Sequence, residues 1–238
     1  MPQESEASLR PERAQESAPT GAGKSNQGAP PQSGPGGAAS GVGGFSDVPT
    51  GPGPSLPEFL RSNPDRPVKL HLGCGGMRWH DFVNVDLYPA DPDSVDSSRD
   101  GCIAEAYQDI RSLDLPDASV EEIFCAHVIE HFPRWEAIDI LRHWYEVLQP
   151  GGQLVIETPD FRKCVLWLFH PKRSKRELAR TQFYGNQWDR IDFETHRYVW
   201  TLKEMQTALS ECGFRKVRGD HRAHTHHAGR DMRVVATK

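Results

Sequence analysis

The sequence predicts an α/β domain built on a parallel sheet with helices on both faces, and three observations support this class. From residue 68 onward, short apolar segments alternate with amphipathic helical ones. A glycine-rich run, GCGG at 73–76, directly follows the first apolar segment. A helical segment then ends at QPGG, residues 149–152, where proline cannot continue a helix and glycine relieves the turn.

Five strands are expected before the C-terminal third of the chain, at 68–72, 82–85, 105–108, 123–126 and 153–157. The amphipathic helix lies between the last two of them. Its apolar residues recur at spacings of three or four, namely Trp135, Ile138, Leu141, Trp144 and Leu148.

The C-terminal part of the chain predicts one more helix and two closing strands. Thr201 and Glu204 have the spacing of a capping box, which starts a helix, and Gly213 provides its exit. The strands are expected at 215–218 and 232–237. The long stretch between Phe161 and Tyr198 fits no strand, and such excursions are commonly lids or substrate-binding segments.

Residues 1–57 differ in composition from the rest of the chain. They hold 11 of the 21 Gly and 10 of the 19 Pro, with few large apolar side chains. Such a segment cannot bury enough apolar surface to offset the entropy of ordering it. We therefore expect a disordered tail at 1–57 and one domain at 58–238.

Charge, cysteine content and hydropathy exclude several classes of protein. With 28 Lys and Arg against 33 Asp and Glu, the chain has no global field that would hold a nucleic acid. Its five cysteines lack a C-x-x-C spacing and are odd in number, which favours reduced thiols and a cytoplasmic location. The sequence shows neither a secretory signal nor a transmembrane segment, and it gives no indication of an oligomeric state.

The turn after the first strand predicts a nucleoside-binding site. A bare main chain at the carboxyl end of a strand lets a ligand approach closely, and Asp86 ends the next strand with a carboxylate that can accept two ribose hydroxyls. A tight connection and a turn aspartate are the alternatives. A dinucleotide is disfavoured, because Arg78 occupies the third glycine position of the fingerprint and Asp86 follows Gly73 by only 13 residues.

A series of motifs then carries a family resemblance: HLGCGG, VNVDLYP, YQDIRSLDLPDASVEEIFCAHVIEHF, LRHWYEVLQPGGQLVIETPDF and HRYVWTLKEMQTALSECGF. From about Val68 to Lys238 the chain resembles a class I S-adenosylmethionine-dependent methyltransferase. Within that class it is most similar to predicted methyltransferases associated with saccharide biosynthesis. The resemblance implies a three-layer Rossmann-like fold with a seven-stranded, mostly parallel sheet in the order 3-2-1-4-5-7-6 and an antiparallel last strand.

The resemblance also implies which residues bind the cofactor. Gly73 and Gly75 would border the methionine, Asp86 would hold the ribose, and Asp109 with Ile110 would frame the adenine. The full implied set is His71, Leu72, Gly73, Cys74, Gly75, Asp86, Leu87, Asp109, Ile110 and His127. Two positions depart from the family pattern: His71 replaces an acid, and Met77 replaces the third glycine.

The segment His127-Val-Ile-Glu130-His131 follows the fourth strand, at the edge where ligands of parallel sheets bind. If a helix begins there, its two imidazoles and its carboxylate share one face. His131 or His127 is then a general base for a hydroxyl acceptor. Alternatively, these residues and His196 bind a divalent cation, since H-x-x-E-H with a later HRYVWT is similar to the metal site of small-RNA 2′-O-methyltransferases. A purely structural role is the third alternative.

Asp160, in the turn after the fifth strand, is a further candidate catalytic residue. It either orients a sugar hydroxyl or the base, or caps the helix that begins near Phe161. Tyr184 and Trp188 either stack on a sugar ring or belong to the core. For the histidines at 221, 224, 226 and 227 we expect adventitious nickel binding rather than a native site.

The stretch 162–180 combines apolar and basic residues. It is either a lid that meets an anionic substrate, such as a nucleotide- or lipid-linked sugar at a membrane surface, or an amphipathic helix with a solvated face. The predicted function is methyl transfer from S-adenosylmethionine to an oxygen of a saccharide or other small hydroxylated acceptor. The competing hypothesis is a catalytically silent S-adenosylmethionine-binding domain that acts as an interaction module.

Overall fold

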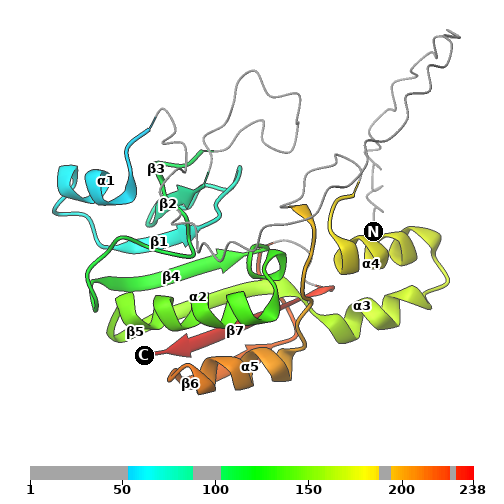
Figure 1. Ribbon diagram of the computed structural model, residues 1–238. Helices are drawn as coiled ribbons and strands as arrows, with labels where there is room; N and C mark the ends of the chain where they lie inside the picture. Colours follow the sequence, from blue (N-terminus) through cyan, green and yellow to red (C-terminus); the bar gives the residue numbers. More distant parts are fainter. Residues whose placement is uncertain (1–52, 88–102, 188–193, 226–228) are drawn as a thin grey trace, which may run out of the picture. The chain divides into compact units, whose positions relative to one another are not determined.

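Figure 1 shows a computed structural model of the chain, which describes residues 53–87, 103–187, 194–225 and 229–238. Its centre is a seven-stranded sheet in the order β3-β2-β1-β4-β5-β7-β6. The strands are β1 Lys69–Leu72, β2 Val83–Asp86, β3 Ala106–Tyr107, β4 Val120–Ala126, β5 Leu148–Pro159, β6 Arg215–Asp220 and β7 Asp231–Thr237. The first five pair in parallel, and β7 runs antiparallel to both β5 and β6.

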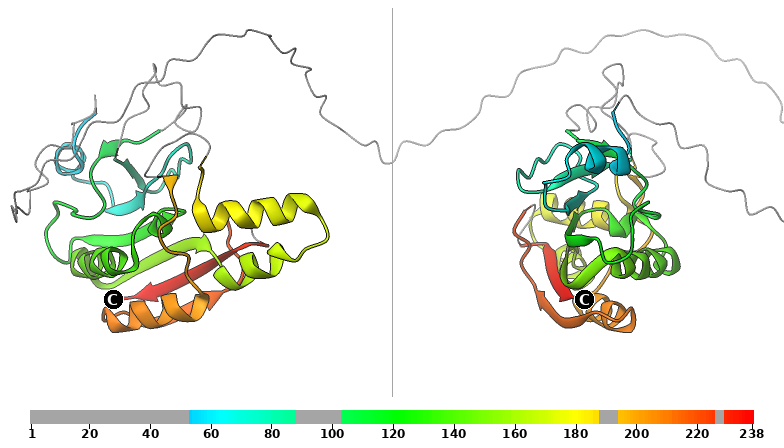
Figure 2. Two further views of the ribbon diagram at one scale, coloured as in Figure 1. Left: turned by 45° about the vertical axis from the view of Figure 1, so that its right-hand side comes forward. Right: turned by 90° about the vertical axis from the view of Figure 1, so that its left-hand side faces the viewer.

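The described helices are α1 Leu56–Ser62, α2 Arg134–Val147, α3 Phe161–Leu168, α4 Arg173–Tyr184 and α5 Leu202–Glu211, with a 3-10 turn, η1, at Ile129–His131. In Figure 1, α2 crosses in front of β4 and β5, and α5 lies along β6 and β7. The view along the sheet in Figure 2 places α2 and α5 on the same side of it.

One face of the sheet forms the main core. The register sets Leu70 beside Val83 and Ile123, and Ile123 beside Leu154, so alternate residues of successive strands point to the same side. Apolar residues of α1, α2 and α5 pack onto that side; Leu56, Trp144 and Leu209 are fully buried. On the opposite face, a smaller cluster joins Phe124 and Val155 of the sheet to Trp79 and Phe82 of the connection before β2.

The predicted fold class is confirmed in its sheet order and in the antiparallel last strand. The predicted strands are all present, with β4 and β5 longer than expected, and the capping box of Thr201 and Glu204 starts α5. No helix lies between β1 and β2, as the short spacing predicts. Leu56, assigned to the tail from composition, belongs instead to α1.

The predicted helix starting at His127 is wrong. His127 has a φ of +56°, outside the helical region, and only the short η1 follows before Pro133. Consequently the faces of His127, Glu130 and His131 are not aligned by helical spacing.

The stretch 162–180, for which a lid and an amphipathic helix were the alternatives, folds into two helices. α3 and α4 contact each other side by side and project beyond the carboxyl ends of the parallel strands in both Figure 1 and the left view of Figure 2. Trp188, His226 and His227, which were singled out from the sequence, lie outside the described residues. Among the residues described, no helix combines the length and hydropathy needed to cross a bilayer.

Candidate cofactor site and catalytic centre

The glycine-rich turn begins the site and requires glycine for two different reasons. Gly73 has a φ of +67°, and a Cβ there would lie 2.3 Å from Val128 Cγ2, so the turn packs directly against the segment after β4. Gly75 has a φ of +47°, and a Cβ there would meet nothing within 4 Å. Gly75 therefore leaves open space on the side where it lines a cavity.

Asp86, at the end of β2, is held by the main chain around it. Its Oδ2 accepts a hydrogen bond from the Gly75 amide at 2.8 Å, and its Oδ1 accepts one from the Leu87 amide at 2.7 Å. An ionised carboxylate offers about four acceptor positions, so two remain for a ligand. The carboxylate thus joins the two parts of the predicted nucleoside site in one orientation.

A cavity of about 600 Å³ opens beside this turn. That volume lies in the range typical of pockets that enclose a small molecule. Its lining includes seven of the predicted site residues, Gly73, Gly75, Asp86, Leu87, Asp109, Ile110 and His127, together with the catalytic candidate His131.

The far end of the cavity is formed by Asp109 and Ile110. Asp109 is fixed by Arg111, whose Nε lies 2.9 Å from Oδ2 and whose Nη2 lies 2.5 Å from the same oxygen. The hydrogen bonds that Arg111 donates to Asp109 raise the pKa of Arg111 above its usual value despite partial burial. The Ile110 carbonyl accepts a hydrogen bond from the indole of Trp144, which anchors this loop to α2.

Three predicted cofactor residues are not placed in the cavity. The side chains of His71, Leu72 and Cys74 are buried, and none of the three lines the cavity. His71 instead faces the second core cluster and lies with Nδ1 3.2 Å from Asn84 Oδ1. Burial lowers its pKa, so it remains neutral there. Only the main chain of these residues stays available to a cofactor.

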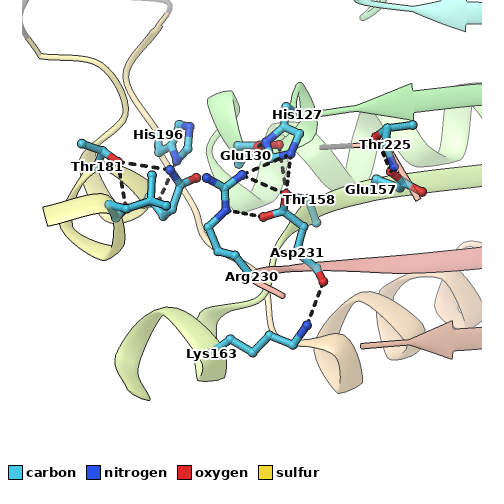
Figure 3. A network of polar contacts seen from close by, with 12 residues as sticks. His127, Glu130, Glu157, Thr158, Lys163, Thr181, His196, Thr225, Arg230 and Asp231 are labelled. Carbon is cyan, nitrogen blue, oxygen red and sulfur yellow. Dashed lines mark hydrogen bonds and ion pairs between the residues drawn. The ribbon is translucent and has the colours of Figure 1, made fainter. Parts of the chain in front are cut away.

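His127 is held between two buried carboxylates, as Figure 3 shows. Its Nε2 lies 3.0 Å from Asp231 Oδ2, and its Nδ1 lies 3.1 Å from Glu130 Oε1. Burial alone would lower the pKa of His127, but the two carboxylates outweigh it and raise the pKa to about 9. His127 therefore carries a proton on both nitrogens near neutral pH, which favours His131 over it as the base; the base role of His127 stays a prediction.

Arg230 completes this network from the start of β7. Its Nε lies 2.5 Å and its Nη2 2.8 Å from the carboxylate oxygens of Asp231, and both side chains are buried (Figure 3). Positive and negative groups thus alternate from Arg230 through Asp231 and His127 to Glu130. Each buried charge therefore lies next to an opposite charge, which offsets the free-energy cost of removing it from water.

Glu130 is fully buried at the inner end of this chain of charges. Its Oε2 accepts a hydrogen bond from Thr158 at 3.0 Å, whereas Oε1 lacks a well-aligned hydrogen bond. Burial would raise its pKa, but His127 and the two nearby histidines lower it to about 2. Glu130 is therefore ionised at neutral pH.

His131 and His196 lie beside that carboxylate, although they are 65 positions apart in the sequence. Their rings meet edge to face with centroids 4.8 Å apart, and one potential ligand atom from each of Glu130, His131 and His196 lies within 4.8 Å of the other two. His196 Nδ1 lies 2.7 Å from the Gln182 carbonyl oxygen, which can only accept. The proton of a neutral His196 therefore sits on Nδ1, and Nε2 keeps its lone pair.

The trio Glu130, His131 and His196 matches the metal candidates predicted from the sequence. Within the described parts of the chain it is the group whose geometry suits a cation, and His127 lies outside it. His221 binds Asp160 through Nδ1 at 2.9 Å, and the amide of His224 binds Glu157, so these two histidines form no metal cluster.

Asp160 fits its structural alternative. It is the N-cap of α3, where Oδ1 accepts a hydrogen bond from the Arg162 amide at 3.0 Å. It is fully buried and does not line the cavity, so the role predicted for it at the acceptor is not supported by its position. Tyr184 is 64% exposed and thus not a core residue.

Other lining residues were missed by the sequence reasoning, namely Arg111, Val128, Phe132, Glu136, Glu194 and Arg197. Most are adjacent to predicted residues, and that adjacency was the signal available. Glu194 is different, because the chain between α4 and α5 brings it to the cavity. This segment packs closely against Gly185. A side chain at position 185 would prevent the contact, because its Cβ would clash with the Glu194 carbonyl.

Comparison with known proteins agrees with this arrangement. A family model described as a methyltransferase domain matches residues 47–218, and the chain belongs to that family. The predicted enzyme class, an S-adenosylmethionine-dependent methyltransferase, is confirmed at this level. The closer resemblance to methyltransferases of saccharide biosynthesis stays a prediction.

A mouse protein named tRNA (carboxymethyluridine(34)-5-O)-methyltransferase ALKBH8 is 28% identical over 117 residues, which are 47% of this chain and 18% of the mouse protein. The chain thus spans less than a fifth of that relative. Among solved structures, an Archaeoglobus fulgidus SAM-dependent methyltransferase is 14% identical over 76% of this chain and 92% of that one, with a TM-score of 0.47. The PH0226 protein of Pyrococcus horikoshii is 16% identical over 76% and 86%, with the same TM-score.

Proposed function

We propose that S-adenosylmethionine lies in the 600 Å³ cavity with its ribose on Asp86 and its adenine beside Asp109 and Ile110. The observation that carries this proposal is the pairing of Asp86 with the Gly75 amide. Gly75 and Asp86 line the same cavity, so a diol bound there could donate both its protons to the remaining acceptor positions of the carboxylate.

The acceptor is proposed to be an oxygen of a small hydroxylated molecule, a saccharide in the first place. In the reaction the acceptor oxygen forms a bond to the methyl carbon, the bond from that carbon to sulfur breaks, and S-adenosylhomocysteine leaves. The mouse relative supports an oxygen acceptor, because its name specifies a 5-O-methyltransferase. Positioning accounts for much of such an in-line displacement, and the proton of the hydroxyl must be accepted nearby.

His131 and His196 are the proposed proton acceptors. His131 lines the cavity, and the lone pair of His196 on Nε2 is available because Gln182 holds the proton on Nδ1. Burial lowers the pKa of His196, which favours the neutral form that a base requires. Ionised Glu130 then stabilises the imidazolium formed when the proton arrives.

A divalent cation at Glu130, His131 and His196 is the alternative mechanism. The compact placement of one carboxylate and two imidazoles favours it, and the bond from His196 to the Gln182 carbonyl resembles the outer hydrogen bonds that orient metal-binding histidines. A bound cation would lower the pKa of an acceptor hydroxyl. Full activity after exhaustive chelation would exclude this mechanism and retain the imidazole base.

The test of the proposed function combines binding with turnover. Calorimetric titration with S-adenosylmethionine should show one site, and radiolabelled methyl transfer should follow on a panel of saccharides, nucleotide-linked sugars and lipid-linked sugars. Transfer RNA belongs in the same panel, because the mouse relative acts on tRNA by its name. Labelling of tRNA with no labelling of sugars would replace the saccharide proposal. Cofactor binding without turnover on any acceptor would favour a silent interaction domain.

Two further proposals concern the setting of the enzyme. A cytoplasmic location is supported by the thiols of Cys125, Cys164 and Cys212, which are unbridged. The N-terminal tail that precedes α1 is proposed to be dispensable for chemistry. The cavity draws all its lining residues from Gly73 onward, and deletion of residues 1–50 should leave cofactor affinity unchanged.

A further inference from the structure

The α3–α4 hairpin, residues 161–184, concentrates the positive charge of the chain. It holds seven Lys and Arg against one acid, Glu177, for a net charge of +6 in a chain whose net charge is −5. The rest of the chain therefore carries a net charge of −11. A segment that differs so strongly from the molecule around it is a candidate surface for an anionic partner.

The tip of this hairpin also exposes apolar side chains. Phe169 is 83% exposed and Leu166, one helical turn earlier, is 69% exposed. Two exposed cations, Lys172 and Arg173, follow directly across the turn. Both apolar side chains stay exposed to water instead of packing between the two helices, and an exposed apolar patch of this kind is a candidate interaction surface.

The turn between the helices is rigid rather than loose. The guanidinium of Arg176 donates hydrogen bonds to the carbonyls of His170 and Pro171, and the ammonium of Lys175 lies 4.7 Å from the centroid of the Trp167 ring. These contacts hold the two helices while Leu166 and Phe169 point outward. The apolar tip and its flanking cations are thus a fixed arrangement.

The hairpin is joined to the candidate catalytic centre at its other end. The carbonyl of Gln182, in the last turn of α4, holds Nδ1 of His196, and the carbonyl of Tyr184 accepts a hydrogen bond from the His196 amide. Figures 1 and 2 show the hairpin at the carboxyl edge of the sheet, the edge from which the glycine-rich turn also leaves. A partner held at the tip would therefore lie on the side of the molecule where acceptors enter.

We propose that the tip of the α3–α4 hairpin docks on an anionic lipid surface. Leu166 and Phe169 enter the boundary between headgroups and acyl chains, and the cations around them bind lipid phosphates. Leu166 and Phe169 favour a lipid surface over a nucleic acid as the partner, because a nucleic-acid backbone offers aliphatic and phenyl side chains no comparable apolar environment. This docking also specifies the substrate class of the enzyme, and that part rests on the proposed function: the acceptor would be a hydroxylated molecule carried by a lipid.

Vesicle co-sedimentation of the full chain tests the docking without any requirement for activity. We expect binding to vesicles of phosphatidylcholine with 30% phosphatidylglycerol, little binding to pure phosphatidylcholine, and a loss of binding as salt rises. Phe169→Ser should weaken partitioning into the vesicles roughly tenfold or more, since it removes a large apolar area that docking would bury in the lipid. The pair K172Q and R173Q should weaken it about fivefold or more, since a cation near such a surface is worth about fivefold and Arg173 is already paired with Glu177 at 2.6 Å.

Matched controls separate docking from general effects of substitution. Trp135→Ser removes another exposed aromatic side chain, 73% exposed on α2, and the pair K203Q and R215Q removes two exposed cations near β6. Both controls should bind vesicles like the unchanged chain. Circular dichroism of each variant reports folding. Cofactor titration of the unchanged chain distinguishes the two proposals, because vesicle binding without cofactor binding by that chain rejects the function alone.

Three results would overturn the docking. They are an absence of binding to the anionic vesicles, equal binding by Phe169→Ser, and equal binding to neutral and anionic vesicles. A single-stranded RNA oligonucleotide that binds the hairpin and is lost in the K172Q and R173Q pair, with no vesicle binding, would identify the surface as a nucleic-acid site instead.

Discussion

Replacement of Asp86 tests the cofactor site most directly. Its two oxygens accept hydrogen bonds from the amides of Gly75 and Leu87. Asp86→Ala removes these partners and also the two acceptor positions proposed for the ribose. Each lost hydrogen bond to a charged group costs about 1.5–3 kcal/mol, so the loss of cofactor binding should reach about 3–5 kcal/mol.

Calorimetric titration measures this loss, and it corresponds to a cofactor dissociation constant raised several hundredfold or more. Asp86→Asn keeps the shape and one acceptor oxygen, so its loss should be smaller than that of Asp86→Ala. Asp65→Asn, an exposed carboxylate near α1, is the matched control and should leave affinity unchanged. Affinity within twofold of the unchanged chain in Asp86→Ala would refute the placement of the ribose on this carboxylate.

Three further predictions follow from the same geometry. Gly73→Ala should destabilise the fold, because its Cβ would meet Val128 and the backbone there is already strained for any residue but glycine. Gly75→Ala should retain more stability but weaken cofactor binding. Equal melting temperatures for the two variants would contradict this. His131→Ala should abolish methyl transfer with cofactor affinity largely kept, and normal turnover would reject its role. Burial would raise the pKa of Glu105, but its hydrogen bonds to Arg66 and Asn84 lower it to about 2. This stabilisation is present above about pH 4.5 and is lost as the pH falls toward 2, so the stability difference between the unchanged chain and Glu105→Gln should shrink in that window, and a constant difference would argue against the ion pair.

The fold and half of the site were readable because they depend on local sequence patterns. The end of a strand can be predicted where a polar residue or a glycine follows an apolar run, and parallel strands bring their carboxyl ends to one edge of the sheet. The glycine turn and Asp86 were predicted on that basis and Asp109 from the family resemblance, and all three line one cavity. The burial of the His71 and Cys74 side chains was not predicted, because alternation along a short strand and turn leaves the direction of a side chain open until neighbouring strands pack.

The catalytic centre shows where sequence reasoning reaches its limit. Spacing alone aligned His127 with Glu130 and His131 on a helix, but a positive φ at His127 and the short η1 turn replaced that helix. The protonation state of His127 follows from Asp231, which is 104 positions away and reaches it only because β7 inserts beside β5. No local pattern carries that information.

The sequence by itself determined the alternation of strands and helices, the bare turn and the carboxylate that follows it, because these depend on the identity and spacing of neighbouring residues, whereas the order of the strands came from the family resemblance. Only the tertiary structure decided which titratable groups meet. Glu130, His131 and His196 converge from segments on either side of the α3–α4 hairpin, and burial together with long-range pairing sets the pKa of each shifted group. Such charges depend on the distance to a partner and on exclusion of water, and both arise only when the chain has packed.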